Sequence, residues 1–232
     1  LRSSQSTLAQ ACTGFGKSAL AVDFCLDAVR HNKTVTINVP RKELARQLGK
    51  TLTKYGLQHG FIASGTKPNP FAPVQVELTE SLARRLDKAH KSDLLITDEC
   101  HVGGESLTSI VDGWKAAGKK LIGLSATPRR MDGKGMDTWF DDMVCGPQMR
   151  WLIDNGRLNQ YKVVVSDEAL KQAQSSGASE EEIDRVMFGD AVKTYQEHAW
   201  GLRTLVFCRT IKHAEDVAAW YSENGIPSAA IS

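Results

Sequence analysis

The sequence predicts an α/β fold in which helices cover both faces of a parallel sheet. Two observations carry this prediction. Short apolar or β-branched runs alternate with longer stretches of helical spacing, and a glycine-rich loop joins the first run to the first helical stretch. Strands that alternate with helices pair in parallel, because each helix returns the chain to the edge of the sheet where the previous strand began. A hydrophobic fraction of 41% beside 24% charged residues is typical of a globular domain with a sizeable core.

Six short runs predict the strands of a first domain. In chain order they are a run containing Leu8, Ala9 and Ala11, followed by Thr34–Val39, His59–Ala63, Val74–Leu78, Leu94–Asp98 and Leu121–Ser125. Four stretches between them have the spacing of amphipathic helices. These are Ser18–Arg30, Arg41–Tyr55, Glu80–Lys91 and Leu107–Ala117. Helices therefore connect most of the predicted strands, as a parallel sheet requires.

The rest of the chain alternates less regularly. The glycine- and acid-rich stretch Asp132–Pro147 is expected to be a loop. Helices are expected at Met149–Asn159, Ser179–Phe188, Ala191–Ala199 and Ile211–Asn224. Strands are expected at Tyr161–Val165, Thr204–Cys208 and Gly225–Ser232. Because the first residue is not Met and the last residues predict a strand that enters a sheet, we expect the chain to be a fragment at both ends.

The composition indicates which kinds of partner the protein can bind and in which compartment it is expected. A net charge of +2 supplies no overall basic excess, so a surface that binds nucleic acid has to be a local one. The five cysteines lie far apart without metal-ligand spacing, which is typical of reduced thiols in a cytoplasmic protein. No apolar stretch approaches the roughly 18 residues of a membrane span, and the first residues lack a signal-peptide layout. We therefore expect a cytoplasmic protein without a membrane partner.

The loop that joins the first strand to the first helix, Ala11-Cys12-Thr13-Gly14-Phe15-Gly16-Lys17-Ser18, has the features of a triphosphate site. Its backbone N–H groups turn toward one point, where the helix dipole favours an anion. Lys17 adds a positive charge for the β- and γ-phosphates, and the Ser18 hydroxyl can bind Mg²⁺. Because Ala11 stands where a glycine is usual, the alternative is a simple strand-to-helix turn. We assign nucleotide binding to Thr13, Gly14, Gly16, Lys17 and Ser18.

An acidic pair follows the predicted strand Leu94–Asp98. That strand delivers Asp98 to its carboxyl end, where ligands bind in open α/β sheets. Asp98 can hold Mg²⁺ there, and Glu99 can polarise an attacking water. The alternative is an acidic pair exposed to solvent, and the phosphate loop earlier in the chain makes this interpretation the less favoured one.

Together with the phosphate loop, four further segments resemble motifs of superfamily 2 helicases and translocases (DEAD/DEAH-box type). Asp98-Glu99-Cys100-His101 is similar to their Asp-Glu-x-His box, and Ser125-Ala126-Thr127-Pro128 matches their third motif. Val39–Gln47 resembles the segment that contacts the nucleic-acid backbone, and Arg203–Glu215 resembles the fourth motif. Gly123–Gly135 is close to the branch that includes the type III restriction translocating subunit and the excision-repair-type DNA helicases.

The resemblance implies an organisation and a set of roles. It implies a RecA-like ATP-binding domain over residues 1–147, a linker and helical segment over 148–202, and the beginning of a second RecA-like domain over 203–232. It implies ATP hydrolysis with Mg²⁺, coupled to movement along nucleic acid, with DNA favoured over RNA. Catalytic roles fall on Lys17, Asp98, Glu99 and His101, metal binding on Ser18 and Asp98, and coupling between nucleotide state and domain movement on Ser125 and Thr127. Nucleic-acid contacts fall on Pro40, Arg41, Gly65, Thr79 and Ser81.

Two other classes of function stay open at this point. A P-loop kinase or simple NTPase shares the phosphate loop, although it has no use for Ser125-Ala126-Thr127-Pro128. A non-catalytic nucleotide- or DNA-binding module is the second, because an arginine finger, which supplies about 10³–10⁵ in rate, is not among the matched motifs. The isolated chain is then expected to be weakly active or inactive. The motifs do not determine whether a nuclease or methyltransferase partner exists.

Overall fold

The computed structural model describes residues 4–62, 69–89, 91–130, 132–164 and 192–231. The chain forms two compact units, Leu1–Gln160 and Tyr161–Ser232. Within the described ranges, no helix is both long enough and apolar enough to cross a bilayer.

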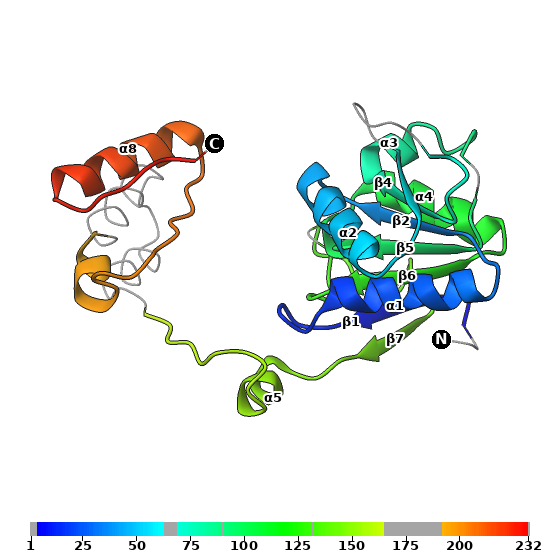
Figure 1. The fold of residues 1–232 in the computed structure, drawn as a ribbon, viewed down its shortest axis with the longest axis horizontal. Helices are drawn as coiled ribbons and strands as arrows, with labels where there is room; N and C mark the ends of the chain where they lie inside the picture. Colours follow the sequence, from blue (N-terminus) through cyan, green and yellow to red (C-terminus); the bar gives the residue numbers. More distant parts are fainter. Residues whose placement is uncertain (1–3, 63–68, 90, 131, 165–191, 232) are drawn as a thin grey trace. The chain divides into compact units, whose positions relative to one another are not determined.

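A parallel sheet forms the centre of the first unit (Figure 1). Its strands are β1 Ser6–Gln10, β2 Val35–Val39, β3 His59–Ile62, β4 Val74–Leu78, β5 Leu94–Asp98, β6 Lys120–Ser125 and β7 Asp142–Cys145. Across the sheet they stand in the order β3-β4-β2-β5-β6-β1-β7, and each of the six pairings is parallel. The predicted parallel α/β class is therefore confirmed.

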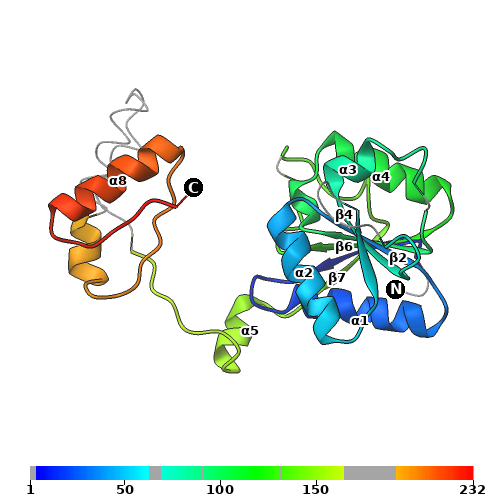
Figure 2. The same cartoon turned by 45° about the horizontal axis from the view of Figure 1, so that its top comes forward.

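Helices cover both faces of this sheet. They are α1 Lys17–Arg30, α2 Lys42–Lys54, α3 Thr79–Ala83 and α4 Glu105–Ala116, with a short 3₁₀ turn at Cys100–Val102 and the outlying α5 Met149–Asp154. Figure 2 shows the sheet between a layer that holds α1 and α2 and a layer that holds α3 and α4. The bounds of α1, α2 and α4 agree with the predicted helices to within two residues at each end.

The sheet has one hydrophobic core on each face, and successive residues of a strand contribute to different cores. In β5, Leu95 packs toward α4 while Ile96 packs toward α1 and α2, because successive side chains of a strand point to opposite faces. The α4 layer is closed by Ile110 and Trp114, both fully buried. The opposite layer is closed by Val22 of α1 and the leucines of α2. This packing on two faces fixes the strands whose carboxyl ends carry the loops described below.

The predicted loop Asp132–Pro147 is wrong in part, because it contains β7. This strand pairs in parallel with the free side of β1, with Thr7 opposite Asp142 and Gln10 opposite Cys145. All four β7 residues are exposed, and their sequence, Asp-Met-Val-Cys, lacks the alternation of apolar and polar residues from which such a strand is predicted. Its backbone hydrogen bonds to β1, rather than buried side chains, hold it in the sheet.

Two predicted helices are shorter than expected. The stretch Glu80–Lys91 forms α3 only as far as Ala83 and continues in tight turns, in which Arg85 directs its side chain back to the buried Glu77. The stretch Met149–Asn159 forms α5 only as far as Asp154. Gly156 then adopts a left-handed φ of 65°, the usual way in which a glycine ends a helix.

The regular secondary structure in the described residues of the second unit is helical. A helix over residues 192–198 and α8, Ile211–Glu223, pack around a small core of Val192, Val217, Tyr221 and Ile226. The predicted strands Tyr161–Val165, Thr204–Cys208 and Gly225–Ser232 are wrong over their described residues, where no strand forms. A strand needs the backbone of a partner strand, and no described segment pairs with these residues. The predicted helix Ser179–Phe188 lies outside the described residues.

Candidate nucleotide site and nucleic-acid surface

Three predicted motifs meet at the carboxyl ends of three neighbouring strands. The phosphate loop follows β1, the acidic pair ends and follows β5, and Ser125 ends β6. Since β6 lies between β5 and β1, the ends of these three strands come together although they are far apart in the chain. The register sets Gln10 opposite Ser125 and Asp98 opposite Leu124. This edge is where ligands bind in open α/β sheets.

The phosphate loop has the backbone that an anion site needs. Gly14 and Gly16 adopt φ of 85° and 104°, which glycine reaches without strain. Gly16 caps α1 without a side-chain bond, and the first turn of the helix holds no acidic residue. The N–H groups of Lys17 and Ser18 have no carbonyl within the helix to receive them. Together with the helix dipole they favour a bound phosphate.

Lys17 points back over the loop toward the acidic pair. Its Nζ lies 3.5 Å from the backbone O of Ala11 and 3.6 Å from Oε1 of Glu99, and only 10% of its side chain is exposed. Both contacts are long, so the ammonium keeps hydrogen-bonding capacity for a stronger acceptor. A triphosphate in the loop is such an acceptor.

The two carboxylates beside Lys17 have different environments. Burial, reinforced by the negative charge of Glu99, raises the pKa of Asp98 above its ordinary value. Glu99 has a left-handed φ of 49°, and its N–H donates to Oδ1 of Asp98 over 3.0 Å. A buried carboxylate that is costly to ionise gains most from a nearby cation. Hard oxygen ligands fit Mg²⁺, which proteins usually hold through one or two carboxylates together with substrate phosphates.

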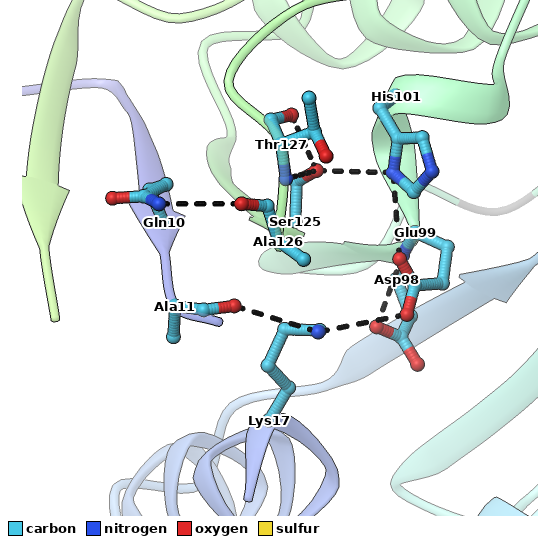
Figure 3. A network of polar contacts seen from close by, with 9 residues as sticks. All are labelled: Gln10, Ala11, Lys17, Asp98, Glu99, His101, Ser125, Ala126 and Thr127. Atoms are coloured by element: carbon cyan, nitrogen blue, oxygen red, sulfur yellow. Dashed lines mark hydrogen bonds and ion pairs between the residues drawn. The ribbon is translucent and has the colours of Figure 1, made fainter. Parts of the chain in front are cut away.

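A chain of polar contacts leads from Lys17 to the end of β6 (Figure 3). Oε2 of Glu99 lies 3.4 Å from Nδ1 of His101, and that nitrogen lies 3.0 Å from Oγ of Ser125. Ser125 is fully buried, and its Oγ donates to the backbone O of Thr127 over 2.7 Å. The backbone N–H of Thr127 returns a bond of 3.1 Å to the same Oγ. The predicted catalytic and coupling residues therefore lie in one connected network.

The predicted nucleic-acid residues that the structure describes lie beyond β2 and β4. Pro40 and Arg41 follow β2, and Arg41 is the exposed N-cap of α2. Thr79 and Ser81 lie in α3, directly after β4. Val39 is paired with Leu78, so the two chain segments leave the sheet side by side. Gly65 lies outside the described residues.

Thr79 is engaged within the protein. It is 9% exposed, and its hydroxyl lies 3.0 Å from Oδ1 of Asn38 and 3.2 Å from the backbone O of Val39. These contacts tie the start of α3 to the segment that carries Arg41. A side chain held in this way positions the neighbouring backbone.

Sequence reasoning missed Gln10 and Asn38. Nε2 of Gln10 donates to the backbone O of Ala126 over 3.2 Å, which ties the entry of the phosphate loop to the segment after β6. Asn38 is 2% exposed and anchors Thr79. An amide side chain in the last two residues of a strand was the available signal in both cases. Neither residue belongs to a motif.

Comparison with known proteins gives one family model and several relatives. The model described as type III restriction enzyme, res subunit, matches residues 2–130. A 51.5 kDa protein of Lactococcus phage (isolate 7-9) is 28% identical over 224 residues, which are 94% of this chain and 47% of that protein. The putative mitochondrial ATP-dependent helicase irc3 of Schizosaccharomyces pombe is 29% identical over 244 residues, with 94% of this chain and 40% of that protein covered.

A solved structure shares the fold. The helicase domain of Hef from Pyrococcus furiosus superposes with a TM-score of 0.55 at 16% identity, over 95% of this chain and 52% of that one. The predicted RecA-like fold is thereby confirmed. The chain spans about half the length of these proteins, or less.

Proposed function

Because the chain belongs to the family of the type III restriction enzyme res subunit, we propose that it is the ATP-hydrolysing part of a helicase or translocase that moves along nucleic acid. The matched segment ends at residue 130, so it includes the phosphate loop, the acidic pair and Ser125 to Thr127. DNA is the favoured track, since the motifs are closest to a branch that includes DNA helicases. Five free thiols agree with a cytoplasmic setting.

Each residue of the site has a separate task in this proposal. Thr13, Gly14 and Gly16 shape the loop around the phosphates, and Lys17 neutralises charge that develops on the transferred phosphoryl group. Asp98 and Ser18 hold Mg²⁺, which when bound neutralises further phosphate charge. Glu99 accepts a hydrogen bond from the attacking water and orients it in line with the bond that breaks.

The single observation that carries the coupling part of the proposal is the contact between His101 and Ser125. This contact of 3.0 Å joins the acidic pair to the segment after β6, and through Thr127 it reaches the loop that follows. A kinase or simple NTPase needs no such connection between its acidic pair and a neighbouring strand. We propose that the contact lets the state of the nucleotide change the position of Ser125 to Thr127. We further propose that Pro40, Arg41, Ser81 and Gly65 meet backbone phosphates, and that Thr79, whose hydroxyl is held by Asn38 and Val39, meets them through its backbone.

Binding and turnover are expected to differ in the 232-residue chain. The residues assigned above account for phosphate binding, metal binding and water orientation. An arginine finger, which supplies about 10³–10⁵ in rate, is not among them. We therefore propose that the chain binds ATP well and hydrolyses it slowly.

Replacement of Lys17 tests the nucleotide site. Lys17→Ala should weaken binding of a fluorescent ATP analogue by about 100-fold, because charge-assisted hydrogen bonds to the phosphates are lost. Equilibrium titration in the presence of Mg²⁺ measures this change. Lys33→Ala, which removes an exposed lysine at the other edge of the sheet, is the matched control and should bind like the parent. Equal affinity in Lys17→Ala and the parent would refute the site.

Stimulation by nucleic acid separates the proposal from its rivals. A helicase or translocase should hydrolyse ATP faster when DNA is added, whereas a kinase or simple NTPase should not respond. A non-catalytic module should bind the analogue and show no hydrolysis under either condition. Single-turnover measurements with labelled ATP detect slow chemistry and so suit this chain.

A further inference from the structure

We propose that residues 146–158, which leave the sheet after β7, brace the phosphate loop, and that Leu158 is a positioning residue for nucleotide binding. This inference rests on the proposed function of the same site. It extends the site to a segment that the predicted motifs do not include and that the matched family segment does not reach.

The first half of this segment lies against the entry of the phosphate loop. The N–H of Gly146 donates to the backbone O of Gln10 over 2.7 Å, which continues the pairing between β1 and β7 by one residue. A Cβ on Gly146 would lie 3.3 Å from Cβ of Ala11, so the two backbones approach closely. Sγ of Cys12 lies 3.6 Å from the backbone O of Pro147, within reach of a weak thiol hydrogen bond. The last residue of β1 and the first two residues of the loop thus lie against the segment.

The second half folds back so that Leu158 reaches the centre of the loop. Leu152 of α5 is 3% exposed, and its backbone O accepts hydrogen bonds from the N–H groups of Arg157 and Leu158, at 2.7 and 3.2 Å. Gly156, with its left-handed φ, makes this return possible. A Cβ on Gly14 would meet Cδ2 of Leu158 and would lie 3.4 Å from both Cδ1 and Cγ. The leucine therefore fills the space beside Gly14 where another residue would carry a side chain.

This contact matters because the loop has little else to hold it. Residues 13–16 are exposed, and two of these four are glycines, which have the largest conformational freedom of any residue. Fixing such a loop around phosphates costs conformational entropy at the moment of binding. A contact that orders the loop beforehand lowers that cost and so raises affinity. Leucine offers no hydrogen bond to phosphate, so Leu158 acts through the position of Gly14.

The linkage is reciprocal. If Leu158 helps the loop to adopt its binding conformation, a bound nucleotide must stabilise the placement of Leu158 by the same free energy. Leu158 is two residues before Gln160, where the first unit ends. The segment that continues into the second unit is therefore in direct contact with the loop that binds the nucleotide.

Titration of the 232-residue chain with a fluorescent ATP analogue and Mg²⁺ tests the inference. Leu158→Ala should weaken binding about three- to tenfold, the effect expected when part of one residue's backbone freedom is restored. Leu158→Met, which keeps an apolar side chain of similar volume, should restore most of the affinity. Phe71→Ala removes an exposed apolar side chain before β4, outside residues 146–158, and should leave affinity unchanged. Thermal unfolding without nucleotide shows whether each variant is folded at the temperature of the titration.

Hydrogen exchange provides a second measurement that general loss of stability would not imitate. Nucleotide should slow exchange at the amides of Arg157 and Leu158 in the parent and in Leu158→Met, and it should do so less in Leu158→Ala. Equal or tighter binding by folded Leu158→Ala, or no nucleotide effect on these amides in the parent, would overturn the inference while leaving the nucleotide site intact. Failure of the parent to bind the analogue would instead overturn the proposed function together with the brace.

Discussion

Glu99 is the residue with the most unusual backbone in the candidate site. A left-handed conformation in a residue other than glycine costs about 1–3 kcal/mol and persists where the surroundings impose it. Here it turns the Glu99 side chain toward Lys17 and His101 while its N–H faces Asp98. Two consecutive carboxylates are thereby directed at different partners. Their tasks should be separable by mutation.

Amide substitutions at the two carboxylates should give different profiles. Glu99→Gln should retain binding of Mg²⁺ and the ATP analogue while hydrolysis falls about 10²- to 10⁴-fold, because an amide accepts a proton far less readily than a carboxylate. Asp98→Asn should weaken the part of analogue binding that depends on Mg²⁺. Titrations with and without Mg²⁺, combined with single-turnover hydrolysis, measure both effects. Identical profiles for the two variants would contradict the division of tasks.

Among the elements, β2 and β5 are joined at their amino ends by Asp93. Oδ2 of Asp93 accepts bonds from the backbone N–H of Thr34 at 3.0 Å and from its hydroxyl at 3.1 Å, and Oδ1 lies 3.3 Å from Nζ of Lys119. The backbone hydrogen bond from Thr34, helped by Lys119, holds the pKa of Asp93 at about 2. The ionised carboxylate is thus favoured by folding, and it fixes where these two strands begin.

Asp93→Asn should lower the free energy of unfolding at pH 7 by about 1 kcal/mol, a value reduced because the side chain is one-third exposed and screened by water. A carboxylate whose folded pKa lies below its unfolded value stabilises the fold at pH above the unfolded value, near 3.8, and loses this contribution as the pH falls toward 2. Urea unfolding of parent and variant between pH 7 and pH 3 measures the difference, which should shrink with acid. Asp23→Asn, on the exposed face of α1, is the control and should differ little from the parent at any pH. If the difference in free energy of unfolding between Asp93→Asn and the parent stayed constant with pH, the effect would come from side-chain packing and not from the charge of Asp93.

For the whole molecule, charge is nearly balanced, so contact with nucleic acid depends on where its basic side chains stand. Arg41 is exposed beyond β2, at the edge of the sheet that also carries the phosphate loop. Lys33 is also exposed but precedes β2 and so stands at the opposite edge. The two residues form a matched pair for measuring a local effect.

Arg41→Ala should weaken binding to unrelated oligonucleotides by similar factors and should make the salt dependence shallower. Each lost phosphate contact reduces the slope of log K against log salt by roughly 0.7–0.9, and backbone contacts carry no sequence information. Fluorescence anisotropy over a salt series, with several sequences, measures both quantities. Lys33→Ala should leave the slope unchanged. A loss confined to one sequence would indicate base readout instead.

The sequence by itself determined the local elements and the chemistry of the motifs. It predicted β4 and β5 with the bounds that the structure shows, and α2 to within one residue at each end, because apolar periodicity and strand propensity are properties of neighbouring residues. The glycines and Lys17 of the phosphate loop were identified for the same reason. The conformations of these glycines and the position of Lys17 depend on residues within the loop itself.

Tertiary structure alone decided which strands pair and what the motifs touch. The strand β7 exists because β1 offers a free side, and the segment Thr204–Cys208 stays without a described partner although its composition is that of a strand. The contact between His101 and Ser125 depends on β6 standing between β5 and β1. Gln10 and Leu158 acquire their partners from segments more than 100 residues away in the chain. Pairing and packing between segments so far apart depend on which strands and side chains the whole fold brings together. A local pattern of residue types does not contain that information.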